Sequence, residues 1–111
     1  MSMFRSFLFF KDANAAGESG VFNNAMCTDG SIEIKGDATS FSLEVQGAVD
    51  TENPNAIVWT TMFAINETDL TTVSAIEAKG LYYINAVGKS VRVKINSISG
   101  GSLTVVGKFS E

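Results

Sequence analysis

The stretch GLYYINAVGKSVRVKINSISGGSLTVVGKF, residues 80–109, decides the fold of this chain. In 91–95 apolar residues alternate with basic ones, and in 103–109 apolar or small residues alternate with a second set. Such period-two alternation directs one set of side chains to a core and the other to water. The Gly100-Gly101 pair between the two runs supplies the positive φ angles of a tight hairpin turn. The stretch therefore predicts antiparallel strands, and it carries no recognisable chemistry.

Further strands are expected along the rest of the chain, at 4–10, 31–35, 41–49, 57–65, 72–78 and 81–85. Turn signals separate them every eight to twelve residues, which is typical of a sandwich or barrel. We therefore predict an all-β fold: a single antiparallel β-sandwich, jelly-roll or Ig-like, of about eight short strands. Residues 1–111 are expected to form one domain, in which 1–29 supply an N-terminal strand and a loop.

The alternation also predicts which side chains face the core. In the run 41–49 the inward set includes Phe41 and Val49, and in 57–65 it includes Phe63 and Ile65. The principal core residues are expected to be Leu43, Val45, Trp59, Val91, Val93, Ile95, Leu103 and Val105.

Composition narrows the chemistry. The chain has no histidine and one cysteine, so it lacks the commonest general base and metal ligand and any internal disulfide. Cys27, within an apolar patch, is expected to be a buried structural thiol. The loop 50–55 offers oxygen ligands, but its spacing does not fit an EF-hand and a solvated turn is favoured. We expect no enzyme, no cofactor and no metal.

Charge and hydropathy bound the partners. The net charge is −4, from 8 basic and 12 acidic residues, and nucleic-acid binding would show a basic excess. No stretch approaches the ~20 apolar residues that span a bilayer. The apolar run 1–10 is short and ends at Lys11, so we expect synthesis in a cytoplasm, no membrane and no nucleic acid.

The surface is expected to be partly covered by other protein. Charged residues make up 18% of the chain, against a typical ~25%, and there are eight phenylalanines. This predicts a homo-oligomer, a trimer or dimer, or a place in a larger assembly. The candidate interface is Phe4, Phe7, Leu8, Phe9, Phe10 and Phe22. The alternative is that these side chains cover one end of the core.

Several motifs together resemble a known family. The strand 41–49 is followed by the acidic Asp50 and the run IVWTT at 57–61. A glycine-aromatic strand follows at 80–85, then a VRV strand at 91–93 and a Ser-Gly turn at 99–101. Over residues 30–109 the layout resembles small β-sandwich virion structural proteins of tailed bacteriophages and prophages. The insertion 52–55 and the phenylalanine-rich start depart from that pattern.

The resemblance implies a non-enzymatic role on the phage particle, as capsid decoration, head fibre or tail component. The implied location is the virion, after synthesis in the host bacterium, and the implied partners are the major capsid or tail protein.

The alternative is a carbohydrate-binding module or receptor-binding accessory domain that uses Tyr82 or Tyr83 with the loop 50–55. These two tyrosines lie on opposite faces of one strand, so one is expected to be buried and the other exposed. Exposed aromatics in a groove would favour that alternative, whereas a flat apolar patch would favour self-association.

Overall fold

The computed structural model describes residues 4–23, 29–49, 58–87 and 89–110, which contain ten β-strands and no helix. Within these residues, therefore, no helix is available to cross a membrane. The prediction of an all-β chain is confirmed. The strands are β1 (Phe4–Ala13), β2 (Gly17–Glu18), β3 (Asp29–Gly36), β4 (Ser40–Val49), β5 (Thr60–Met62), β6 (Ala64–Asn66), β7 (Thr72–Val73), β8 (Gly80–Asn85), β9 (Lys89–Ser99) and β10 (Leu103–Ser110).

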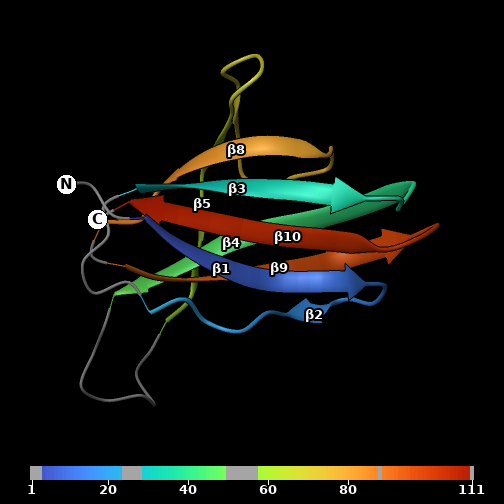
Figure 1. Cartoon of the computed structure of the whole chain (residues 1–111), viewed down its shortest axis with the longest axis horizontal. Coiled ribbons are helices and arrows are strands. Elements are labelled where there is room, and N and C mark those ends of the chain that lie inside the picture. Colours follow the sequence, from blue (N-terminus) through green and yellow to red (C-terminus); the bar gives the residue numbers. More distant parts are fainter. Residues whose placement is uncertain (1–3, 24–28, 50–57, 88, 111) are drawn as a thin grey trace.

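Two antiparallel sheets form the sandwich that the sequence predicts. The larger sheet has the order β1-β10-β3-β8-β6-β7 and the smaller has the order β2-β9-β4-β5. In Figure 1, β8, β3, β10 and β1 lie side by side in one layer, and β4 and β9 cross behind them. Buried side chains from both sheets form one hydrophobic cluster between the layers.

Consecutive strands often belong to different sheets, and this corrects the predicted hairpin at 99–102. β9 pairs with β4 and β2, whereas β10 pairs with β1 and β3, so the turn joins the two layers. Gly100 and Gly101 do adopt positive φ, 73° and 139°. The alternation of apolar residues is the same for two strands that pair and for two that pack face to face, so the pattern could not distinguish these arrangements.

A second crossing lies beside the first. At the end of β3, Gly36 has φ 132°, and a Cβ there would meet the Ser102 carbonyl oxygen at 2.3 Å. The Asp37 carboxylate accepts a hydrogen bond from the Ser102 amide at 2.8 Å. That bond, the largest cause, lowers the pKa of Asp37 below its usual 3.8. The two crossing turns are thus joined at one end of the sandwich.

The predicted core is confirmed for all but one of its principal residues. Leu43, Val45, Val91, Val93, Ile95, Leu103 and Val105 are fully buried. Trp59 is the exception, because it is only half-buried and lies outside the core cluster. The Arg92 guanidinium lies 4.4 Å from the centroid of its ring, on the outer side of the smaller sheet.

The described part of the run 57–65 is divided between two strands, because the chain leaves the smaller sheet after β5 and enters the larger one at β6. Its alternation continues across Phe63, but on the face opposite to the one expected, since Met62 packs against the core. Phe63 is 70% exposed and Ala64 is buried instead. Val49, also expected inside, is exposed at the end of β4. In the predicted strand 72–78 only Thr72–Val73 are strand, and Ile76 reaches the core through a bridge to Leu43.

Candidate functional site: the outer face of the larger sheet

The outer face of the larger sheet is organised by strand register into rows of side chains. These residues alternate with buried ones, so they point away from the core. One row crosses β1, β10, β3 and β8 and continues into β6; two shorter rows flank it. The central row is Ser6, Lys108, Ser31, Tyr83 and Ile65; the flanking rows are Phe4, Ser110, Asp29 and Asn85, and Leu8, Val106, Glu33 and Leu81.

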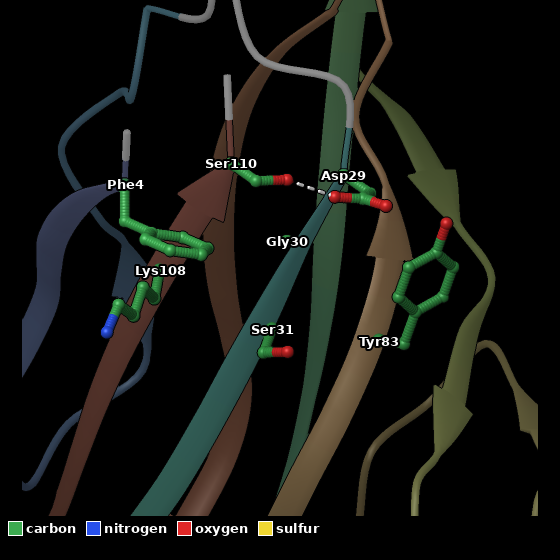
Figure 2. Close-up of a pocket in the computed structure, with 7 residues that line it drawn as sticks. All are labelled: Phe4, Asp29, Gly30, Ser31, Tyr83, Lys108 and Ser110. Carbon is green, nitrogen blue, oxygen red and sulfur yellow. Dashed lines mark hydrogen bonds between the residues drawn. The ribbon is translucent and has the colours of Figure 1, made fainter. Parts of the chain in front are cut away.

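A hollow of about 260 Å³ lies between the central row and the flanking row that begins at Phe4. Figure 2 shows Phe4 and Lys108 on one side of it, Tyr83 on the other and the small Ser31 between them. The backbone under the hollow is Gly30, where a Cβ would lie 2.5 Å from the Phe109 ring beneath the sheet. The hollow therefore exists because small residues on central strands are flanked by large ones.

Polar groups inside the hollow are already oriented. The Ser110 hydroxyl donates to Oδ1 of Asp29, and the Ser31 hydroxyl donates to Glu67 Oε2 at 3.3 Å. Lys108 Nζ lies 5.0 Å from the centroid of the Phe4 ring, within the range of a cation–π interaction. The hollow thus combines one carboxylate, one ammonium group, hydroxyls and two aromatic rings. Among the described residues, no group of three or more acidic, histidine or cysteine side chains could hold a metal ion.

The six predicted interface residues separate into two groups. Phe4 and Leu8 are 58% and 51% exposed on the outer face. Phe9 and Phe22 are buried, and Phe7 and Phe10 pack against the same core cluster. For these four, the alternative of covering the core describes their placement. Phe22 stacks on Phe109 with ring centroids 4.2 Å apart, and Phe9 meets Phe109 edge-on at 6.2 Å.

Alternation along β1 explains most of this division, because Phe4 and Leu8 lie on one side of the strand and Phe7 and Phe9 on the other. A bulge explains Phe10: the register with β10 shifts between Leu8 and Phe10, and Phe10 also packs against the core. Regular pairing before the bulge leaves Phe4 and Leu8 outward. Sequence alone gave no sign of this shift.

The two tyrosines occupy opposite sides of β8, as their alternation predicts. Tyr82 is 2% exposed, and its hydroxyl donates to the Ala78 carbonyl at 2.8 Å. Burial raises its pKa. This corrects the candidate sugar contact at Tyr82, because a ring enclosed by the core cannot stack on a ligand. Tyr83 is half-buried and lines the hollow.

Several predicted features cannot be placed. The loop 50–55 and Cys27 lie outside the described residues. Conversely, Asp29, Ser31, Lys108 and Ser110 are residues of the hollow that were not predicted as a site. Ser31 and Lys108 are polar positions in predicted strands, whereas Asp29 and Ser110 lie just outside them and belong to β3 and β10. The convergence of all four requires the register of strands distant in sequence.

The architecture identifies the class of protein: a small two-sheet sandwich with a hollow on the outer face of its larger sheet. No family model matches the chain, and no curated protein matches it significantly. Two solved structures share the fold. The SPBc2 prophage-derived protein YomS aligns with TM-score 0.88 and 23% identity, over 100% of this chain and 96% of that one.

The second is the PBSX exported protein XepA, with TM-score 0.89 and 20% identity, over 99% of this chain and 38% of that one. The chain thus spans well under half of XepA. At such identities the likeness establishes the shared fold. Both structural neighbours carry phage-related names, SPBc2 prophage and PBSX.

Proposed function

We propose that this protein is a non-enzymatic structural component of a bacteriophage particle that self-associates and docks on the capsid or tail. The observation that carries the proposal is the shared fold with the prophage-derived YomS, which extends over nearly the whole of both chains. A small two-sheet sandwich is suited to repeated packing on a larger surface. Its location would be the virion, and its partners would be copies of itself and the major capsid or tail protein.

Strand β1 and the row beside it supply the proposed contact. β1 is a ten-residue edge strand whose pairing, within the described residues, is with β10 alone. The other edge strands, β2, β5 and β7, have only two or three residues. An open edge presents backbone donors and acceptors to another chain. Leu8, exposed on that strand, begins a row that continues through Val106 to Leu81.

We further propose that the protein catalyses no reaction. This rests on the sequence, which offers no histidine and a single cysteine for nucleophilic or acid–base chemistry. Binding would then be its whole contribution, with affinity supplied by apolar burial and strand pairing.

Light scattering and particle composition test this function. The purified chain should be a dimer or trimer, and Leu8→Lys should shift it toward monomer, because a charge would be buried at the contact. Val58→Lys is the matched control, since Val58 is 74% exposed beside the other sheet. Mass spectrometry should find the protein in purified particles. A monomer at high concentration, together with absence from particles, contradicts the proposal.

A further inference from the structure

We propose that the hollow on the outer face binds a single neutral sugar unit, held by Tyr83 and Asp29. This inference goes beyond the proposed assembly role, and its ligand contacts do not include Leu8. The hollow lies between the row of Phe4 and the row of Tyr83, whereas Leu8 and Leu81 lie in the next row. One face can therefore carry two separable activities.

The size of the hollow sets the size of the ligand. Pockets for drug-sized ligands measure roughly 300–1,000 Å³. At about 260 Å³, this hollow suits one ring with its substituents, and its open side leaves room for a chain continuing into solvent. A terminal unit of a longer glycan would fit as well as a free monosaccharide.

The walls match the two surfaces of a sugar ring. A pyranose presents an apolar C–H face and a rim of hydroxyl groups. Tyr83 is half-buried, so its ring is supported from one side and remains accessible in the hollow. Figure 2 shows its hydroxyl directed toward the same end as the Asp29 carboxylate. A C–H face against the ring of Tyr83 would therefore place sugar hydroxyls near Asp29.

Hydrogen bonding is available in both directions. The Asp29 carboxylate accepts hydrogen bonds, and the Tyr83 hydroxyl can donate or accept them. The Ser110 hydroxyl already bonds to Oδ1 of Asp29, which fixes the carboxylate on the rigid pairing of β3 with β10. One sugar hydroxyl can donate to Asp29 while a neighbouring one bonds to the Tyr83 hydroxyl. The bond to Asp29 is charge-assisted, and such bonds are stronger than neutral ones.

A singly charged ligand meets a like charge at the hollow. A phosphate or carboxylate would face the negative Asp29, and a cation would approach the positive Lys108 on the Phe4 side. Like charges brought together disfavour binding. An uncharged sugar meets no such repulsion.

Amide NMR spectra of the full chain test the proposal directly. The probes are glucose, galactose, rhamnose and N-acetylglucosamine, with glucose 6-phosphate and glucosamine as charged analogues. At least one neutral sugar should shift the Ser31, Tyr83 and Ser110 amides saturably, with a dissociation constant in the millimolar range or tighter. Both charged analogues should bind more weakly. An oligosaccharide array then separates a terminal glycan unit from a free monosaccharide.

Variants assign the binding to the hollow. Tyr83→Ala and Asp29→Asn should each weaken sugar binding about tenfold or more, which corresponds to roughly 1.4 kcal/mol. Val58→Ala is the control, because Val58 is exposed beside the smaller sheet and does not line the hollow. Its spectrum and affinity should match those of the parent chain. The spectra of all variants also report whether they remain folded.

Clear results overturn the inference. It fails if no neutral sugar produces saturable shifts, if folded Tyr83→Ala and Asp29→Asn bind as the parent does, or if a charged analogue binds best. Its failure is distinguishable from failure of the assembly role. Leu8→Lys should change the oligomeric state and leave the sugar-induced shifts in place, whereas Asp29→Asn should do the reverse.

Discussion

The two outer faces of the sandwich differ in how far their side chains contact one another and in the apolar side chains that they expose. On the smaller sheet, Arg92 donates from Nε to Gln46 Oε1 at 2.7 Å and also covers the ring of Trp59. Gln46 is consequently only 8% exposed despite pointing away from the core. Beside it the Thr61 hydroxyl donates to Glu44. These outward side chains of the smaller sheet therefore hydrogen-bond to, or pack on, one another.

The larger sheet also has side-chain hydrogen bonds on its outer face, from Ser110 to Asp29 and from Ser31 to Glu67, but it presents large apolar side chains beside them. Exposed Phe4, Leu8 and Leu81 lie on its outer face, together with the hollow beside Tyr83. Large apolar side chains on an outer face are typical of surfaces that meet a partner. Under the proposals above, the outer face of the smaller sheet serves the stability of the fold and that of the larger sheet serves binding. This division can be tested by comparing substitutions on each face with one in the core between them.

The largest effect is expected for a substitution in the core between the two sheets. Val93→Asp should unfold the protein, because an unpaired charge buried without compensation costs several kcal/mol. Val93 is 0% exposed. Circular dichroism and thermal unfolding measure the outcome. Val58→Asp, the same kind of change at an exposed position, should leave the melting temperature nearly unchanged. A Val93→Asp variant that melts like the parent would contradict the face assignment of β9.

The sequence could predict which side chains face the core only where the alternation within a single strand decides it. Within a strand, alternation identified the inward residues of β9 and β10 correctly, since burial is decided by the immediate period of two. It assigned Trp59 and Phe63 to the wrong face, because these large apolar side chains were expected inside, whereas Met62 and Ala64 face the core. The change of sheet between β5 and β6 leaves no local mark on hydropathy either.

The hollow was beyond sequence reasoning for a related reason. Its residues come from β1, β3, β8 and β10, and their meeting depends on registers between strands up to about a hundred residues apart. Tyr83 could be named as a candidate from alternation alone. Asp29 and Ser110 could not, because nothing near them in sequence shows that they are paired across the sheet.

A second, smaller effect is expected on the smaller sheet. Trp59→Ala should lower the free energy of unfolding by about 1–2 kcal/mol, because it removes the ring beneath the Arg92 guanidinium. Tyr83→Ala on the larger sheet should cost less stability, since its role is proposed to be in binding. Urea unfolding of both variants gives the comparison. Equal losses of stability would show that the two outer faces do not differ in the way described.

The smallest effect concerns the end of the sandwich, where the two layers are joined by Asp37. The amide of Ser102 stabilises the charged carboxylate, so the pKa of Asp37 is lower in the folded protein than its usual 3.8. A depressed pKa contributes stability that is fully present above pH 3.8 and is lost as the pH falls through the lower folded value.

Asp37→Asn keeps an acceptor for Ser102 but does not titrate. Its melting temperature should therefore fall slightly less than that of the parent between pH 5 and pH 2, and scanning calorimetry across that interval measures the difference. Because Asp37 is at the surface, the difference should be small, and salt should reduce it further. Parallel curves for the two proteins would mean that the carboxylate charge does not hold the crossing turns together, leaving that role to the backbone hydrogen bonds that the Asp37 and Ala38 amides donate to the Ser102 carbonyl.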